Sequence, residues 1–206
     1  MKAIEIKGNV LASISYDKTM KIWKLNKENK FENILTIIFQ RSNSYSNIFK
    51  ISKYEFVTSS FSDYSIKFWN SKNFFKLATI ENVETESTYN NFCLLDNDIL
   101  CIGGKSSKGF YLIKISSHQL IKTITGPNTI YSITPCIDGL FLCSIYDENS
   151  IYSIAKYEYN FEKKHLNKVV EKQKAHDNST IYSCIELNKR IIASCSSDYT
   201  IKLWEI

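Results

Sequence analysis

Arginine, glycine and proline are scarce in this sequence. Its 206 residues include 26 Lys plus Arg, yet the only arginines are Arg41 and Arg190, and there are 6 Gly and 2 Pro. The net charge of +5 is therefore carried almost entirely by lysine. Because proteins that read phosphate usually rely on clustered arginine forks, we expect no nucleic-acid partner and take the mild basicity as a solvated surface.

Long apolar segments are also missing. The longest apolar stretch runs from Ile34 to Phe39 and is interrupted by Thr36, whereas a membrane-spanning helix needs roughly 20 residues. The N-terminal segment MKAIEIKGNV contains no apolar core of the kind that a signal peptide requires. We therefore expect no membrane insertion.

The 6 cysteines show no C-x-x-C spacing, which disfavours both metal binding and a redox motif. They lie inside apolar runs such as ILCIGG around Cys101 and IIASCSS around Cys195. Reduced cysteines packed as small hydrophobic residues explain this pattern better than disulfides. A cytoplasmic protein is expected, with the nucleus as the alternative.

The strongest signal is an internal repeat. Three segments align without gaps: ASISYDKTMKIWKL from Ala12, TSSFSDYSIKFWNS from Thr58 and ASCSSDYTIKLWEI from Ala193. Each has a Ser ten residues, an Asp six residues and a Thr or Ser four residues before a Trp. The matched residues are Ser13, Asp17, Thr19 and Trp23; Ser59, Asp63, Ser65 and Trp69; and Ser194, Asp198, Thr200 and Trp204.

Two weaker copies lie between the second and third strong ones. They place Ile113 and Ile154 at the Trp position, and the later copy keeps Asp147 with one extra residue. The five positions are then 46, 44, 41 and 50 residues apart, close to the roughly 40–45 residues of a four-stranded propeller blade. A single domain over residues 1–206 is predicted, with repeat units at approximately 1–25, 33–71, 76–115, 120–156 and 165–206.

Each unit has the pattern of β-strands joined by polar turns, so an all-β chain is predicted. Alternation along TIKLWEI places Ile201 and Leu203 on one face of a strand and Trp204 on the other. The repeated Asp can accept hydrogen bonds from nearby backbone N–H groups in a tight turn, which explains an acid at that position. The charged stretch from Tyr157 to Lys174 is the one place where a short helix is also allowed.

The S-x-x-x-D-x-[TS]-x-K-x-W block resembles the WD-repeat β-propeller family over nearly the whole chain. The resemblance implies a β-propeller of about five four-stranded blades, held by a Trp, Ser or Thr, His and Asp tetrad in each blade. Only the last repeat supplies all four residues: His176, Ser194, Asp198 and Trp204. The first two repeats give partial tetrads without His: Ser13, Asp17 and Trp23, and Ser59, Asp63 and Trp69.

The chain departs from the family pattern in two ways. With so few glycines, Asn, Asp and Lys must serve at turns where the family often uses Gly. The segments between the five units supply only four outer strands, so one blade lacks its outer strand. Since family members usually have seven blades, we expect a partial or incompletely closed propeller, and a closed ring of five is the alternative.

No motif predicts catalysis, a cofactor or a metal site. His176, Ser194 and Asp198 are the residue types of a nucleophilic triad, but no G-x-S-x-G accompanies them, and the tetrad accounts for all three. GGKSSKG from Gly103 resembles the end of a phosphate loop but lacks the preceding Gly and a following helix. Neither the three histidines nor acidic pairs such as Asp96 and Asp98 have a ligand-like or catalytic spacing.

Binding of other proteins or peptides is the predicted function, without catalysis and without a small-molecule substrate. The resemblance places the binding face at the entrances of the first strands and at the turns before the repeated Asp. The aromatic residues at those positions are Tyr16, Phe49, Tyr89, Tyr131, Tyr146 and Tyr182. Aromatic side chains suit protein interfaces, although the same tyrosines could merely pack between blades. The alternative function is a regulatory or substrate-receptor propeller attached to a ubiquitin ligase or protein kinase whose catalytic part lies outside this chain.

Overall fold

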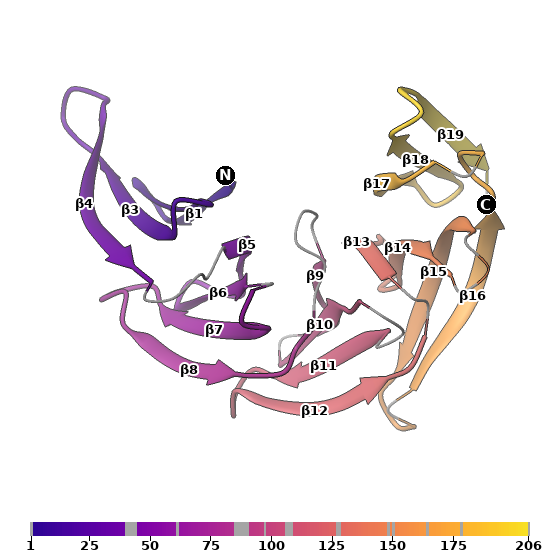
Figure 1. Ribbon diagram of the computed structural model, residues 1–206, viewed down its shortest axis with the longest axis horizontal. Helices are drawn as coiled ribbons and strands as arrows, with labels where there is room; N and C mark the ends of the chain where they lie inside the picture. Colours follow the sequence, from indigo (N-terminus) through magenta and orange to yellow (C-terminus); the bar gives the residue numbers. More distant parts are fainter. Residues whose placement is uncertain are drawn as a thin grey trace. The chain divides into compact units, whose positions relative to one another are not determined.

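In the computed structural model, the described residues form nineteen β-strands in five antiparallel sheets (Figure 1). It describes residues 2–39, 45–60, 62–84, 91–96, 98–105, 109–126, 129–147, 149, 151–163, 165–177 and 179–205. Among these residues there is no helix, and hence none that could cross a membrane. The predicted all-β fold of about five sheets is confirmed.

The chain divides into two compact units, Met1–Ser87 and Thr88–Ile206. The first unit contains two four-stranded sheets, each with its strands in chain order. The first sheet consists of β1 (Lys2–Lys7), β2 (Val10–Ile14), β3 (Thr19–Leu25) and β4 (Phe31–Ile38). The second consists of β5 (Tyr45–Lys50), β6 (Glu55–Ser60), β7 (Ser65–Asn70) and β8 (Lys76–Ile80). A single domain over the whole chain stays a prediction.

The second unit contains three sheets. The third sheet consists of β9 (Phe92–Leu94), β10 (Ile99–Gly103), β11 (Phe110–Lys114) and β12 (Gln119–Ile124). The fourth consists of β13 (Thr129–Pro135), β14 (Phe141–Tyr146), β15 (Tyr152–Asn160) and β16 (His165–Gln173). The fifth consists of β17 (Ile181–Asn188), β18 (Ile191–Ser196) and β19 (Ile201–Glu205).

The sheets are offset by one strand from the sequence repeats. The fourth strand of a sheet falls at or near the start of the next predicted repeat, as β16 does in the unit 165–206. Within the described residues the fifth sheet has three strands and the other four sheets have four. The strand count made from the sequence is therefore correct.

One packing arrangement recurs within each unit. The face of a sheet that bears the Trp, or its replacement, packs against the opposite face of the preceding sheet. In the first unit, Met20 and Ile22 of β3 join Phe56 and Trp69 of the second sheet in one buried cluster. In the second unit, the equivalent clusters contain Cys101, Leu112, Phe141, Cys143 and Tyr157 between the third and fourth sheets, and Leu142, Ile154, Ile192 and Trp204 between the fourth and fifth.

A helix within residues 157–174, which the sequence allowed, is wrong. Two long strands, β15 and β16, occupy this stretch and pair Tyr157 with Lys168 and Tyr159 with Leu166. Tyr157 and Tyr159 are buried while Glu158 between them is exposed, which is the two-residue period of a strand. The stretch is rich in charge because β16 is the outermost strand of its sheet and mostly faces solvent.

Because the chain has few glycines, other residues adopt the left-handed backbone conformation at several of its turns. The residue after the repeated Asp has a positive φ in all three strong repeats: Lys18 (66°), Tyr64 (51°) and Tyr199 (64°). The Asp carboxylate holds this turn, because Asp17 Oδ1 accepts Thr19 N–H (3.0 Å) and Asp198 Oδ1 accepts Thr200 N–H (2.9 Å). Lys18 fits the expectation that Asn, Asp or Lys takes the place of glycine in turns. Tyrosine at positions 64 and 199 was not expected.

We predict that Tyr199→Gly stabilises the chain. Tyr199 is 99% exposed, so its side chain contributes little packing. A residue with a Cβ costs about 1–2 kcal/mol in the left-handed region, which glycine avoids, and the extra flexibility of glycine in the unfolded chain offsets part of this. Urea unfolding should show a gain of about 1 kcal/mol over wild type and none for Tyr199→Ala. A loss of stability with glycine would contradict the assignment of strain to this turn.

Candidate functional site

Four side chains of the fifth repeat form a continuous chain of hydrogen bonds. The indole Nε1 of Trp204 on β19 donates to Ser194 Oγ on β18 over 2.8 Å. The same oxygen lies 2.7 Å from His176 Nε2, and His176 Nδ1 lies 2.7 Å from Asp198 Oδ2. The structure thus brings together the four residues that the sequence assigns to a complete tetrad.

The direction of these bonds follows from what each group can donate. The Asp198 carboxylate only accepts, so His176 Nδ1 carries the hydrogen, and in the neutral ring Nε2 then accepts the Ser194 hydroxyl hydrogen. Desolvation acts to raise the pKa of Asp198, but hydrogen bonds from His176 and Thr200 outweigh it and hold that pKa well below its usual range. His176 is 0% and Ser194 2% exposed. The Ser194 hydroxyl is therefore a buried structural link and is not placed to attack a substrate.

The bond from an indole N–H to a hydroxyl recurs in the first two sheets. Trp23 Nε1 donates to Ser13 Oγ (2.8 Å), as the sequence alignment suggests. In the second sheet, however, Trp69 Nε1 donates to Thr58 Oγ1 (2.9 Å), and Ser59 is not its acceptor. The reason is the register, because Trp69 pairs with Phe56 whereas Trp23 pairs with Leu11, which leaves one more residue in the second hairpin.

In the second sheet, where the sequence has no tetrad His, an ion pair stabilises the turn around Asp63. Lys67 Nζ donates to Asp63 Oδ2 (2.9 Å) and to Ser65 Oγ (2.8 Å). Desolvation acts to raise the pKa of Asp63, but hydrogen bonds from Ser65, Lys67 and Ser60 outweigh it and lower that pKa. The Lys67 side chain is 11% exposed, so this pair is largely sheltered from solvent.

The Trp position of the fourth repeat is occupied by Tyr157 and not by Ile154. Tyr157 pairs with Phe141 and packs in the cluster that faces the third sheet, as Trp69 and Trp204 do towards their preceding sheets. Ile154 points to the opposite face and packs in the cluster with the fifth sheet. The turn after Asp147 is longer than the sequence alignment assumed, which moves the equivalent residue along β15.

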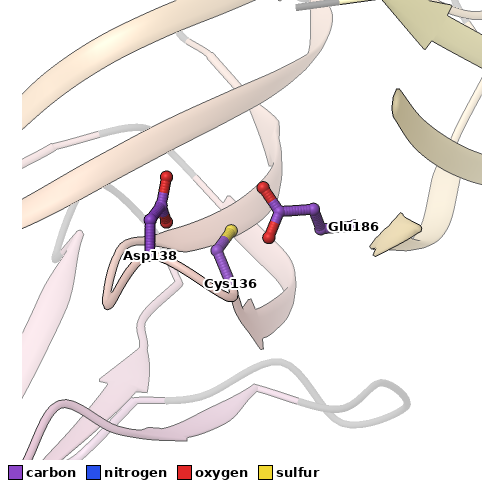
Figure 2. A group of neighbouring side chains, drawn as sticks. All are labelled: Cys136, Asp138 and Glu186. Atoms are coloured by element: carbon purple, nitrogen blue, oxygen red, sulfur yellow. The ribbon is translucent and has the colours of Figure 1, made fainter. Parts of the chain in front are cut away.

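A partly buried ionic cluster, which was not predicted from the sequence, joins the fourth and fifth sheets. Figure 2 shows Cys136, Asp138 and Glu186 pointing toward one another, and their potential ligand atoms lie within 4.8 Å of one another. Lys156 Nζ lies 2.9 Å from Asp138 Oδ2 and 3.0 Å from Glu186 Oε1. The lysine thus supplies the positive charge that a metal ion would otherwise bring.

The electrostatics of this cluster support a structural role. Burial is the main cause that raises the pKa of the Cys136 thiol to about 12, so the reactive thiolate is disfavoured. Desolvation acts to lower the pKa of Lys156, but its bonds to Asp138 and Glu186 raise it overall, so its charge is retained. The cluster is therefore an ion-pair network between two sheets, with Asp138 at its exposed edge.

The aromatic positions predicted for binding have different environments. Tyr16 in the turn between β2 and β3 is 56% exposed, and Tyr182 on β17 is 38% exposed. Phe49 on β5 is half-buried. Tyr89 lies outside the described residues.

Two further predicted positions pack inside the fourth sheet. The Tyr131 and Tyr146 rings contact Tyr152 at centroid distances of 6.2 Å and 4.8 Å. Thr180 of the fifth repeat donates to the Tyr152 hydroxyl over 3.2 Å. These contacts lie within one sheet and not between two blades, and both tyrosines are half-buried, so a binding role for them stays a prediction.

Two exposed tyrosines were not predicted from the sequence. They lie in the turns that carry the repeated Asp, here called the Asp turns. Tyr64 is 47% and Tyr199 99% exposed, and each directly follows the repeated Asp. Together with Tyr16, they give every strong repeat a tyrosine on the same turn of its own sheet. The signal was the dipeptide Asp-Tyr, present at both positions 63 and 198. We call Tyr16, Tyr64 and Tyr199 the turn tyrosines.

The remaining candidates have structural explanations. GGKSSKG joins β10 to β11, so the segment that follows it is a strand and not the helix that a phosphate loop requires. All six cysteines are free thiols, and Cys93, Cys101, Cys143 and Cys184 are buried. Asp96 and Asp98 lie in the turn between β9 and β10.

Comparisons with known proteins agree with this architecture. The model of the WD domain, G-beta repeat family matches residues 167–205, which include Ser194, Asp198 and Trp204. A chain from the crystal structure of the mitotic checkpoint complex is similar in structure, with a TM-score of 0.77 and 15% identity, over 97% of this chain. The WD40 β-propeller domain of Doa1 is similar with a TM-score of 0.67 and 19% identity, also over 97% of this chain. A comparison with curated proteins gives no match.

The chain spans about three fifths of the length of those solved chains, 60% and 61% respectively. This share agrees with the expectation of a partial propeller. At these identities the likeness establishes the fold.

Removing the tetrad hydroxyl should destabilise the chain. Ser194→Ala leaves the Trp204 N–H and His176 Nε2 without their partner, at a cost of about 2–4 kcal/mol. Ser153→Ala is a matched control, because Ser153 is also fully buried but its hydroxyl has no hydrogen-bond partner among the described residues. Urea unfolding should show a large loss for Ser194→Ala and none, or a slight gain, for Ser153→Ala. Equal losses would contradict the tetrad's contribution.

The Asp63 ion pair should give a pH-dependent contribution to stability. A carboxyl with a lowered folded-state pKa stabilises the fold above its unfolded value, about 3.9, and loses that contribution as pH falls through the folded-state pKa. Asp63→Asn should therefore cost roughly 2 kcal/mol at pH 7 and progressively less below pH ~4. Unfolding by urea at several pH values measures this difference. A difference that stays constant between pH 7 and pH 3 would rule out the ion pair as its source.

Proposed function

Because this chain carries a WD40 repeat and has the fold of WD40 β-propellers, we propose that it is a non-catalytic scaffold that binds other proteins. WD40 propellers are typical protein-interaction domains, and one of the structural relatives is part of a protein complex, the mitotic checkpoint complex. The polar residues that most resemble a catalytic set, His176, Ser194 and Asp198, are used in the internal tetrad.

The exposure of the turn tyrosines is the observation that carries the proposal. A large aromatic side chain on a rigid turn offers contact area at a low entropic cost. Tyr64 and Tyr199 do so despite a left-handed backbone that other residues would adopt more easily. Strain kept at exposed positions is typical of functional sites. On this basis the binding surface includes the Asp turns, with Tyr182 as a further contact.

Loss of the turn tyrosines should weaken partner binding about tenfold without unfolding the chain. The variant combines Tyr16→Ser, Tyr64→Asn and Tyr199→Asn, since asparagine tolerates the left-handed region. The control combines Tyr54→Ser, Phe75→Ser and Phe31→Ser, whose side chains are 65%, 70% and 49% exposed. Quantitative mass spectrometry of proteins that co-purify with each form should show recovery of partners by wild type and control, and about tenfold less with the variant.

The outcome also separates the two functions. Partners that include a ubiquitin ligase core or a protein kinase would favour the substrate-receptor alternative. Equal recovery by all three forms would remove the turn tyrosines from the binding surface. Turnover of a substrate that His176→Ala abolishes in folded protein would contradict the non-catalytic proposal. A cytoplasmic location stays part of the proposal.

A further inference from the structure

A small pocket in the second unit combines acidic and aromatic side chains. It has a volume of about 300 Å³, and its walls come from the β9–β10 turn, β10, β11, β12, β15 and the β15–β16 turn. Its lining residues are Asp96, Asp98, Ile99, Lys114, Ile121, Tyr159 and Phe161. In the fourth sheet this is the end opposite to Tyr146, because Tyr146 pairs with Tyr152 while Asn160 pairs with His165 at the other end.

Asp96 brings an unused acceptor to this pocket. Its Oδ1 accepts the backbone N–H groups of Asp98 (2.7 Å) and Ile99 (2.6 Å), which fixes the carboxylate in place. Its Oδ2 has no hydrogen-bond partner among the described residues. Both carboxylate oxygens of Asp98, by contrast, accept hydrogen bonds from Ser116: Oδ1 from its backbone N–H (2.7 Å) and Oδ2 from its hydroxyl (3.0 Å).

Tyr159 is the second independent feature. Its side chain lines the pocket although the residue is only 7% exposed, and its hydroxyl forms no hydrogen bond with the described residues. The hydroxyl oxygen is not among the fully buried side-chain atoms that lack a partner, so it is accessible from the pocket. Desolvation, together with the negative charge of Asp96, raises the pKa of Tyr159, so the hydroxyl stays protonated and available as a donor or acceptor.

The charge in the pocket is net negative. Lys114 Nζ lies 4.0 Å from Asp98 Oδ2, and the Lys114 side chain is 53% exposed. Its positive charge therefore offsets the negative charge of Asp98 from the solvent side. The charge of Asp96 remains. Phe161 is 51% exposed and stands edge-on to Tyr159 with ring centroids 4.8 Å apart, which leaves an aromatic surface beside that charge.

We propose that this pocket binds an arginine side chain of a partner protein. A guanidinium is planar and weakly hydrated, stacks on aromatic rings and donates several hydrogen bonds at once, which suits Phe161, Asp96 Oδ2 and the Tyr159 hydroxyl together. A lysine ammonium is more strongly hydrated and fits an aromatic wall less well. A divalent cation would need several free oxygen ligands, and among the described lining residues only Asp96 offers a carboxylate oxygen without a partner. The proposal rests on the proposed protein-binding function and names the chemistry of one contact.

The test is a titration of the full ¹⁵N-labelled chain with a capped Gly-Arg-Gly peptide, followed by NMR. Saturable shifts of the Ile99, Ser116 and Phe161 amides are expected, with a dissociation constant on the order of 1 mM, because a single side chain is bound. The same peptide with citrulline, which has the shape of arginine without its charge, should bind at least roughly tenfold more weakly. A lysine peptide should fall between the two.

Variants assign the contacts. Asp96→Asn keeps the turn, because the amide oxygen still accepts both N–H groups, and should weaken arginine binding roughly tenfold. Phe161→Ala should weaken it about threefold through loss of stacking. Glu5→Gln, which removes an exposed carboxylate on β1, should leave it unchanged.

Three outcomes would each overturn the proposal: equal binding of citrulline, unchanged binding by Asp96→Asn, or shifts that do not saturate. Because the peptide titration does not involve the turn tyrosines, such a failure would leave the co-purification test of the proposed function unaffected.

Discussion

The hydrogen bond from a tryptophan indole to a hydroxyl on the neighbouring strand is the interaction on which this architecture depends. It links Trp23 to Ser13, Trp69 to Thr58 and Trp204 to Ser194. In the first, second and fifth sheets it gives a buried or half-buried indole N–H its partner, and an unpaired N–H there would be costly. Within each unit, neighbouring sheets then pack face to face through buried apolar clusters.

The Asp turns combine structural and binding requirements in the same few residues. The carboxylate fixes the turn through the Thr or Ser two residues later, and the residue between them takes a left-handed conformation. Tyrosine at that position is poor for stability and good for contact with a partner. A gain in stability on replacing Tyr199 together with a loss of binding would be the usual exchange between stability and function.

The sequence predicted the fold through its repeats, because residues fixed by hydrogen bonds recur at constant spacing. It failed where spacing alone does not determine register. One additional residue in the second hairpin moves the acceptor from Ser59 to Thr58, and a longer turn after Asp147 moves the Trp position from Ile154 to Tyr157. The pocket around Asp96 and Tyr159 was not predictable, since its residues lie more than sixty positions apart and meet only because two sheets pack together.

Hydrogen exchange of the indole N–H groups tests the central claim most directly. The chain has 3 Trp, so their Nε1–H signals form a small set in an ¹⁵N correlation spectrum. If these groups are bonded to buried hydroxyls, all three should exchange far more slowly than a free indole, and Ser194→Ala should remove the protection of Trp204 alone. Fast exchange of the three signals in the folded protein would contradict the account.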